Sequence, residues 1–114
     1  RYIRTKAANA AGLCKCVTCG ALKPIAETDA GHFIPKARGK AIYFVEENIH
    51  PQCQGCNRFN VEYSKINYVR FMEETYGPEK IDELMAESRK IVRFRVQDYL
   101  DIEQHYKDLL KEVA

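Results

Sequence analysis

Four cysteines in this sequence form two Cys-x-x-Cys pairs. The first pair is Cys16 and Cys19, and the second pair is Cys53 and Cys56. Two residues between cysteines let both thiolates approach one ion from a tight turn, and four thiolates complete a tetrahedral zinc shell with no open position. The spacing therefore predicts one structural zinc ion per chain, which stabilises the fold and does not activate water.

A fifth cysteine, Cys14, leaves an alternative open at the first pair. It could replace Cys16 as a ligand through a wider turn, but we interpret it as a spare thiol near the metal. A redox role or a chance cluster would not explain two pairs. Five cysteines without a recognisable secretory signal also favour metal binding over disulfides.

His32 is the candidate catalytic base among the three histidines of the chain. A histidine is largely neutral at physiological pH and can take a proton from water. Asn57 directly follows the second cysteine pair, and its carboxamide oxygen is a hard ligand suited to Mg²⁺ or Mn²⁺. Asn57 could meet His32 across the hairpin, and this would place a ligand for a second divalent ion beside the histidine. We interpret His105 as a surface residue and His50 as a residue that orients its loop, with contact to DNA or a metal as the alternative.

The elements that position these residues follow from local patterns. Residues 1–13 predict a basic arm or a short helix that ends at Gly12. Residues 32–34 and 42–45 predict a two-stranded hairpin with a basic loop, and from Asn57 onward the apolar spacing becomes helical. The predicted packing stripes are Ile66, Val69, Met72 and Tyr76, then Ile81, Leu84, Met85, Ser88 and Val92 after the stop at Gly77-Pro78, and finally Tyr99, Ile102, Tyr106, Leu109 and Val113.

Charge is distributed unevenly along the 114 residues, although the net charge is only +2. Residues 1–72 hold 11 basic and 5 acidic side chains, whereas residues 73–114 hold 7 and 11. The first part could therefore face a phosphate backbone, whereas the second part could not do so easily. The alternative is that these charge blocks are ordinary solvated faces. No apolar stretch approaches the roughly 20 residues that a membrane-spanning helix needs, so we expect no membrane partner.

The order of these motifs resembles the zinc-containing HNH (ββα-metal) nucleases, and more closely the NinG, or Rap, recombination endonucleases of lambdoid phages. The resemblance covers nearly the whole chain. The motifs that carry it are Cys16-Val-Thr-Cys-Gly20, Ala30-Gly-His-Phe-Ile34, Glu47-Asn-Ile-His50 and Gln52-Cys-Gln-Gly-Cys-Asn57, with Tyr2-Ile3-Arg4 before them and Tyr76-Gly77 and Tyr106 after them.

The resemblance implies an α+β fold in one domain over residues 1–114. A zinc-stapled ββα-metal (His-Me finger) hairpin–helix core would occupy residues 14–64, and a helical region would occupy residues 65–114. His32 would be the general base, Asn48 would brace the loop that positions it, and Asn57 would bind the catalytic ion. The implied activity is metal-dependent hydrolysis of phosphodiester bonds in branched DNA, such as Holliday junctions and D-loops. A phage or prophage protein of this kind would act in the cytoplasm of the bacterial host.

One position departs from the HNH pattern. These enzymes commonly have a metal-binding Asp or His directly before the base, and here that residue is Gly31. Asp29 is the nearest carboxylate and is the expected second ligand. Glu46, Glu47 or a water molecule are the alternatives.

Basic residues around the predicted site are candidates for phosphate contact. They are Lys36, Arg38 and Lys40 in the hairpin loop and Arg58 beside Asn57. DNA is the expected partner, and no small-molecule substrate is expected. A homodimer is a possible assembly, because symmetric cutting of a four-way junction needs two active sites. The competing hypothesis is a zinc-bound module that binds DNA or protein without catalysis.

Overall fold

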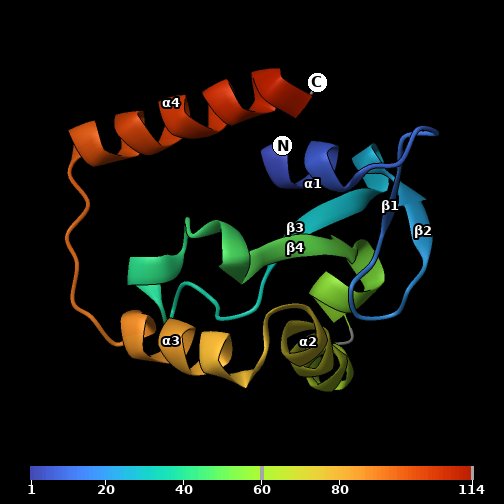
Figure 1. Cartoon of the computed structure of the whole chain (residues 1–114), viewed down its shortest axis with the longest axis horizontal. Helices are drawn as coiled ribbons and strands as arrows, with labels where there is room; N and C mark the ends of the chain where they lie inside the picture. Colours follow the sequence, from blue (N-terminus) through green and yellow to red (C-terminus); the bar gives the residue numbers. More distant parts are fainter. Residues whose placement is uncertain (60, 114) are drawn as a thin grey trace.

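A computed structural model describes residues 1–59 and 61–113 and confirms the predicted mixture of helices and strands (Figure 1). The helices are α1 (Tyr2–Ala7), α2 (Val61–Tyr76), α3 (Pro78–Ser88) and α4 (Val96–Val113). The strands are β1 (Leu13–Lys15), β2 (Leu22–Pro24), β3 (Thr28–His32) and β4 (Ile49–Cys53).

Two small antiparallel sheets carry the candidate residues. Strands β1 and β2 pair with each other, and the first cysteine pair lies in the turn between them. Strands β3 and β4 form the second sheet, in which His32 lies opposite Ile49 and Thr28 lies opposite Cys53. The carbonyl of Pro51 in β4 accepts a hydrogen bond from the amide of Val17, 3.0 Å away. This bond ties the first cysteine turn to the second sheet.

The strands predicted at residues 32–34 and 42–45 are wrong in their bounds and pairing. Strand β3 ends at His32, its partner is β4, and residues 40–42 form a 3₁₀ turn. The cause is a side chain that replaces a strand partner, since the Asn48 carboxamide accepts a hydrogen bond from the amide of Ile34 and donates one to its carbonyl. With its backbone groups already paired, Ile34 needs no neighbouring strand.

The predicted helices are confirmed, but some of their details are wrong. Helix α3 ends at Ser88, so the predicted stripe residue Val92 lies outside it. Gly77, at φ +89°, precedes Pro78 at the start of α3, as the predicted stop requires. The buried face of α2 contains Tyr68 and Met72, whereas Ile66 is 60% exposed. At about 100° per residue, Ile66 lies on the far side of the helix from Tyr68. The N-terminal helix ends at Ala7 and not at Gly12.

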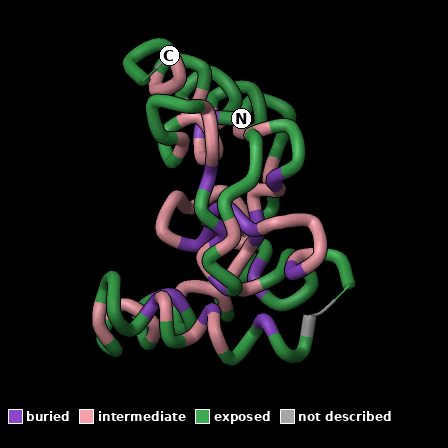
Figure 2. The backbone as a smooth tube through the Cα atoms, turned by 90° about the vertical axis from the view of Figure 1, so that its right-hand side faces the viewer, coloured by how far each residue is buried: buried purple, intermediate pink, exposed green. Residues whose placement is uncertain are grey.

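The β3–β4 hairpin lies between two helical layers, with α1 and α4 on one side and α2 and α3 on the other (Figure 1). The apolar core is small and lies on the α2–α3 side, where Ile42, Tyr68, Met72 and Leu84 are buried. Figure 2 shows buried positions in the middle of the molecule and in the helical layer of α2 and α3, while α4 carries none. The stripe on α4 is therefore only partly covered, and Tyr106 anchors this helix by donating a hydrogen bond to the Phe44 carbonyl.

The part of the chain that the structure describes contains no helix with both the length and the hydropathy that crossing a bilayer requires.

Candidate functional site

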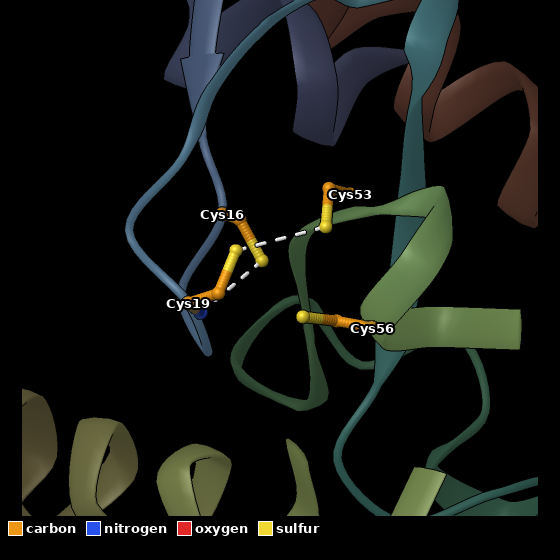
Figure 3. Close-up of side chains that lie close together, drawn as sticks. All are labelled: Cys16, Cys19, Cys53 and Cys56. Atoms are coloured by element: carbon orange, nitrogen blue, oxygen red, sulfur yellow. Dashed lines mark hydrogen bonds between the residues drawn. The ribbon is translucent and has the colours of Figure 1, made fainter. Parts of the chain in front are cut away.

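The four cysteines of the two pairs converge on one point, as Figure 3 shows. Their sulfur atoms all lie within 4.8 Å of one another, and the Sγ atoms of Cys19 and Cys53 are 3.7 Å apart. A tetrahedral zinc ion with Zn–S bonds of about 2.3 Å requires sulfur separations of about 3.8 Å, whereas a disulfide requires about 2.05 Å. The four-cysteine cluster is thus positioned to hold a metal ion, and its geometry is consistent with a structural zinc.

The surroundings of the four-cysteine cluster already favour negative sulfur at one position. Burial raises the pKa of the Cys16 thiol, but hydrogen bonds from Thr18 and from backbone amides outweigh it and lower that pKa to about 6. Burial raises the pKa of the Cys56 thiol to about 12, so this sulfur needs a cation beside it to lose its proton at neutral pH. Cys14 lies outside the cluster, and its buried thiol donates a hydrogen bond to the Arg4 carbonyl.

A cavity of about 440 Å³, here called the His32 pocket, lies next to the four-cysteine cluster. His32 and Asn57, the candidate base and the candidate metal ligand, both line it. Lys36, from the loop after β3, also lines this pocket, together with Gln52 and Lys65. The sequence analysis did not single out the last two residues, which come from β4 and α2.

One hydrogen bond fixes the protonation pattern of the His32 ring. Its Nε2 atom lies 2.8 Å from the carbonyl oxygen of Tyr43, and the two side-chain rings stack with their centroids 4.2 Å apart. A carbonyl can only accept, so Nε2 carries the proton of the neutral ring and Nδ1 keeps its lone pair. Burial lowers the pKa of His32, and the bond to Tyr43 only partly opposes this effect. The ring is therefore held in the neutral form that a general base needs.

Asp29 orients Asn57 and is itself neutralised by an arginine. Its carboxylate accepts a hydrogen bond from Asn57 Nδ2 at 3.0 Å and two from Arg58 at 2.9 Å. These bonds outweigh burial and lower the pKa of Asp29. Because a carboxylate only accepts, Asn57 must turn its amide nitrogen to Asp29, which leaves Oδ1 as the outward acceptor. Asp29 lies outside the described lining of the His32 pocket.

The predicted phosphate contacts occupy different places. Lys36, Arg38 and Lys40 are all exposed, but only Lys36 lines the His32 pocket. The ammonium group of Lys40 instead lies 5.9 Å from the ring centre of Phe94. Lys65 joins Lys36 at the His32 pocket, and its position eight residues after Asn57 is the sequence signal that could have identified it.

His50 links α2 to the strand that carries the candidate base. Its Nδ1 lies 3.1 Å from the hydroxyl of Tyr68, which donates a hydrogen bond to the Gly31 carbonyl at 2.8 Å. Its Nε2 lies 2.7 Å from the hydroxyl of Tyr76. Burial lowers the pKa of His50 to about 4, so the ring is neutral at pH 7. These contacts fit the predicted orienting role, and the exposed His105 fits the predicted surface position.

Asn48 is fully buried and joins the two ends of the loop between β3 and β4. Its carboxamide accepts a hydrogen bond from the Ile34 amide at 2.9 Å. It donates hydrogen bonds to the carbonyls of Ile34 and Ile42, at 3.0 and 3.3 Å. Residue 42 is adjacent to Tyr43, whose carbonyl holds His32. Asn48 therefore braces the segment that orients the candidate base.

Replacement of Asn48 by alanine is expected to lower the free energy of unfolding by about 2–4 kcal/mol. The change removes three hydrogen bonds of a fully buried side chain and leaves the carbonyl of Ile42 and the backbone of Ile34 without these partners. Urea unfolding followed by circular dichroism measures this loss. The matched control is Asn67→Ala on α2, where we expect a change within about 0.5 kcal/mol. Equal stabilities of the two variants would contradict the bracing role.

Comparison with known proteins identifies the family of the chain. The family described as Bacteriophage Lambda NinG protein matches residues 1–114. The chain belongs to the NinG family. It is 32% identical over 101 residues to Protein ninG of Escherichia phage 933W, 31% identical over 101 residues to that of Escherichia phage lambda, and 30% identical over 98 residues to that of Salmonella phage P22. Each match covers 86% of this chain.

The chain spans about half the length of these NinG relatives, since each match covers 47% of the relative. No solved structure matches the chain. The name that these NinG relatives share states no reaction.

Proposed function

We propose that this NinG-family chain is a metal-dependent DNA endonuclease of the zinc-containing HNH class. The observation that supports the proposal is the His32 pocket, which combines a neutral imidazole, a carboxamide oxygen and lysine side chains. These are the groups that phosphodiester hydrolysis needs, namely a base, a ligand for a hard cation and a partner for phosphate. The antiparallel pair β3–β4 followed by α2 also has the strand, strand, helix order of that class.

Each residue of the His32 pocket has a distinct role in the proposed reaction. His32 takes a proton from a water molecule through Nδ1 and keeps its orientation through the bond from Nε2 to the Tyr43 carbonyl. Asn57, turned by Asp29, offers Oδ1 to a Mg²⁺ or Mn²⁺ ion. When bound, this ion polarises the phosphate and stabilises the leaving oxygen. Lys36 and Lys65 bind the flanking phosphates.

The four-cysteine cluster has a separate, structural role in the proposal. One zinc ion, bound by all four thiolates, holds the β1–β2 turn against the residues that lead into α2. Cys56 is a zinc ligand and directly precedes Asn57, so this ion also sets the position of the proposed catalytic ligand. A closed shell of four thiolates takes no part in the hydrolysis.

Branched recombination intermediates, such as Holliday junctions and D-loops, are the proposed substrates. This choice is supported by the resemblance to recombination endonucleases, and the proposed site of action is the cytoplasm of the bacterial host. The test compares cleavage of a synthetic four-way junction and of a linear duplex of the same sequence by zinc-loaded protein with Mg²⁺. Cleavage of the junction in preference to the duplex supports the proposal. Symmetric cuts would further indicate that two copies act together.

The competing function is a zinc-bound module that binds DNA or protein without catalysis. The ion pair between Arg58 and Asp29 favours it, because this pair occupies a carboxylate that could otherwise bind a catalytic ion. Binding of the junction without cleavage, with Mg²⁺ or with Mn²⁺, would support this second reading and contradict the endonuclease.

The pH dependence of cleavage tests the role of His32. Because burial lowers the pKa of His32 below 6.5, the neutral ring persists under mildly acidic conditions. We expect kcat/KM to stay high as the pH falls to 6.5 and to decrease tenfold per pH unit below the lowered pKa. Initial cleavage rates between pH 5 and 8 measure this profile. The inflection should not move when Mn²⁺ replaces Mg²⁺, whereas titration of a metal-bound water would move with the metal.

A further inference from the structure

The side chain of Gln52 fills the space where a side chain of residue 31, directly before His32, would lie. A Cβ atom built on Gly31 would lie 1.9 Å from Oε1 and 2.6 Å from Cδ of Gln52, far inside any real contact. Gly31 is not among the glycines with positive φ, so its backbone conformation does not demand glycine. The carboxamide oxygen of Gln52 thus occupies the position from which a side chain of residue 31 would project.

The orientation of the Gln52 carboxamide follows from the four-cysteine cluster. The hydroxyl of Thr18 lies 3.2 Å from Cys16 Sγ and 3.4 Å from Gln52 Nε2. A metal-bound thiolate can only accept, so the single hydroxyl proton goes to sulfur and the hydroxyl oxygen accepts from Gln52. This arrangement assigns the amide nitrogen of Gln52 to Thr18. Its Oε1 is then directed to the space beside Gly31.

Gln52 also shares the His32 pocket with the proposed base and the proposed metal ligand. Gln52 is 4% exposed and lines this pocket together with His32 and Asn57. Among the residues that the structure describes, Oε1 of Gln52 accepts no hydrogen bond. Because no buried side-chain nitrogen or oxygen of the described residues lacks a hydrogen-bond partner, this oxygen is open to the pocket, where water or a cation can complete it, and carboxamide oxygens suit hard divalent cations.

We propose that Gln52 is the second protein ligand of the divalent cation, in the role that the sequence analysis assigns to an Asp or His directly before the base in HNH enzymes. Asn57 and Gln52 then present two neutral oxygens to the ion, while Asp29 stays paired with Arg58. The inference rests on the proposed function, because it assigns a ligand to the same ion. A neutral ligand pair binds the cation more weakly than a pair with a carboxylate, so this site should require millimolar metal.

Binding of Mn²⁺ to the zinc-loaded chain tests the inference without relying on activity. The electron paramagnetic resonance signal of free Mn²⁺ reports its dissociation constant. Loss of a supporting residue around a metal typically costs tenfold to a hundredfold in affinity, so Gln52→Met, which keeps the length and removes the oxygen, should cost at least about tenfold. The matched control is Gln54→Met in the neighbouring turn, which should bind Mn²⁺ as the parent does. Zinc content should stay unchanged in both variants.

A paired exchange tests the geometry of the site. Gly31→Asp alone should destabilise the protein, because the new side chain collides with Gln52. The double variant Gly31→Asp/Gln52→Ala makes room for the carboxylate and should bind Mn²⁺ at least as tightly as the parent. Recovery of binding in the double variant supports the inference even if Gln52→Met fails to fold.

The outcomes separate this inference from the proposed function. If the zinc-loaded parent binds no Mn²⁺ at millimolar concentrations, both the proposed metal-dependent function and the inference about Gln52 are contradicted. If the parent binds Mn²⁺ and folded Gln52→Met binds it equally well, the inference is overturned and the proposed function stands. A folded double variant that binds no Mn²⁺ would likewise overturn the inference.

Discussion

Replacement of Cys53 by serine is expected to unfold most of the protein at 25 °C. The change removes one thiolate from the four-cysteine cluster, whose sulfur atoms lie within 4.8 Å of one another. Structural zinc sites contribute about 10–16 kcal/mol of apparent binding free energy, whereas a whole domain is stable by only about 5–15 kcal/mol. The core around Met72 is small, so it cannot replace this contribution. Circular dichroism and zinc analysis, with about one zinc per chain in the parent, measure both effects.

Cys14→Ser provides the matched control for this prediction. Cys14 is buried, but its thiol donates to the Arg4 carbonyl and lies outside the four-cysteine cluster. A serine hydroxyl can donate the same hydrogen bond, so this variant should fold and keep one zinc. A chelator should unfold the parent and Cys14→Ser alike. A Cys53→Ser protein that folds normally without zinc would contradict the structural role of the metal.

The four-cysteine cluster was predictable because its chemistry is local. A Cys-x-x-Cys turn positions two thiolates by itself, so only the meeting of the two pairs depends on the fold. The hairpin was misplaced for the opposite reason. The partner strand of β3 is β4, which contains Pro51. A proline in a sequence argues against a strand at that position. Moreover, the hydrogen bonds to the backbone amide and carbonyl of Ile34 come from the side chain of Asn48, fourteen residues away.

In the candidate site, too, residue types were predictable from the sequence and contacts between distant residues were not. His32 and Asn57 could be proposed from residue type and motif, and the structure brings both to one pocket. The tautomer of His32 depends on a carbonyl eleven residues later, and the orientation of Asn57 depends on Asp29 across the β3–β4 hairpin. Gln52 could not be predicted as a site residue, because nothing in its sequence position reveals that its oxygen lies beside residue 31. Such contacts exist only once β3 and β4 are paired.

Replacement of His32 by alanine is expected to lower the rate of junction cleavage by about 10²–10⁴-fold while leaving DNA binding intact. General-base catalysis contributes a factor of this size, and His32 lines the pocket with its Nδ1 unprotonated. Single-turnover cleavage with saturating protein isolates the chemical step. A gel-shift assay with Ca²⁺ in place of Mg²⁺ measures affinity for the same junction.

The controls for His32→Ala separate catalysis from folding and from the loss of a ring. His105→Ala removes an exposed imidazole and should cleave as the parent does. Thermal unfolding of His32→Ala should stay cooperative, because among the described residues the ring stacks on Tyr43 alone and the four cysteines are untouched. Since the change leaves space against the Tyr43 ring, added imidazole should restore part of the activity. Full activity of a folded His32→Ala protein would remove His32 from the reaction, whereas partial rescue by imidazole would identify the missing group as the base itself.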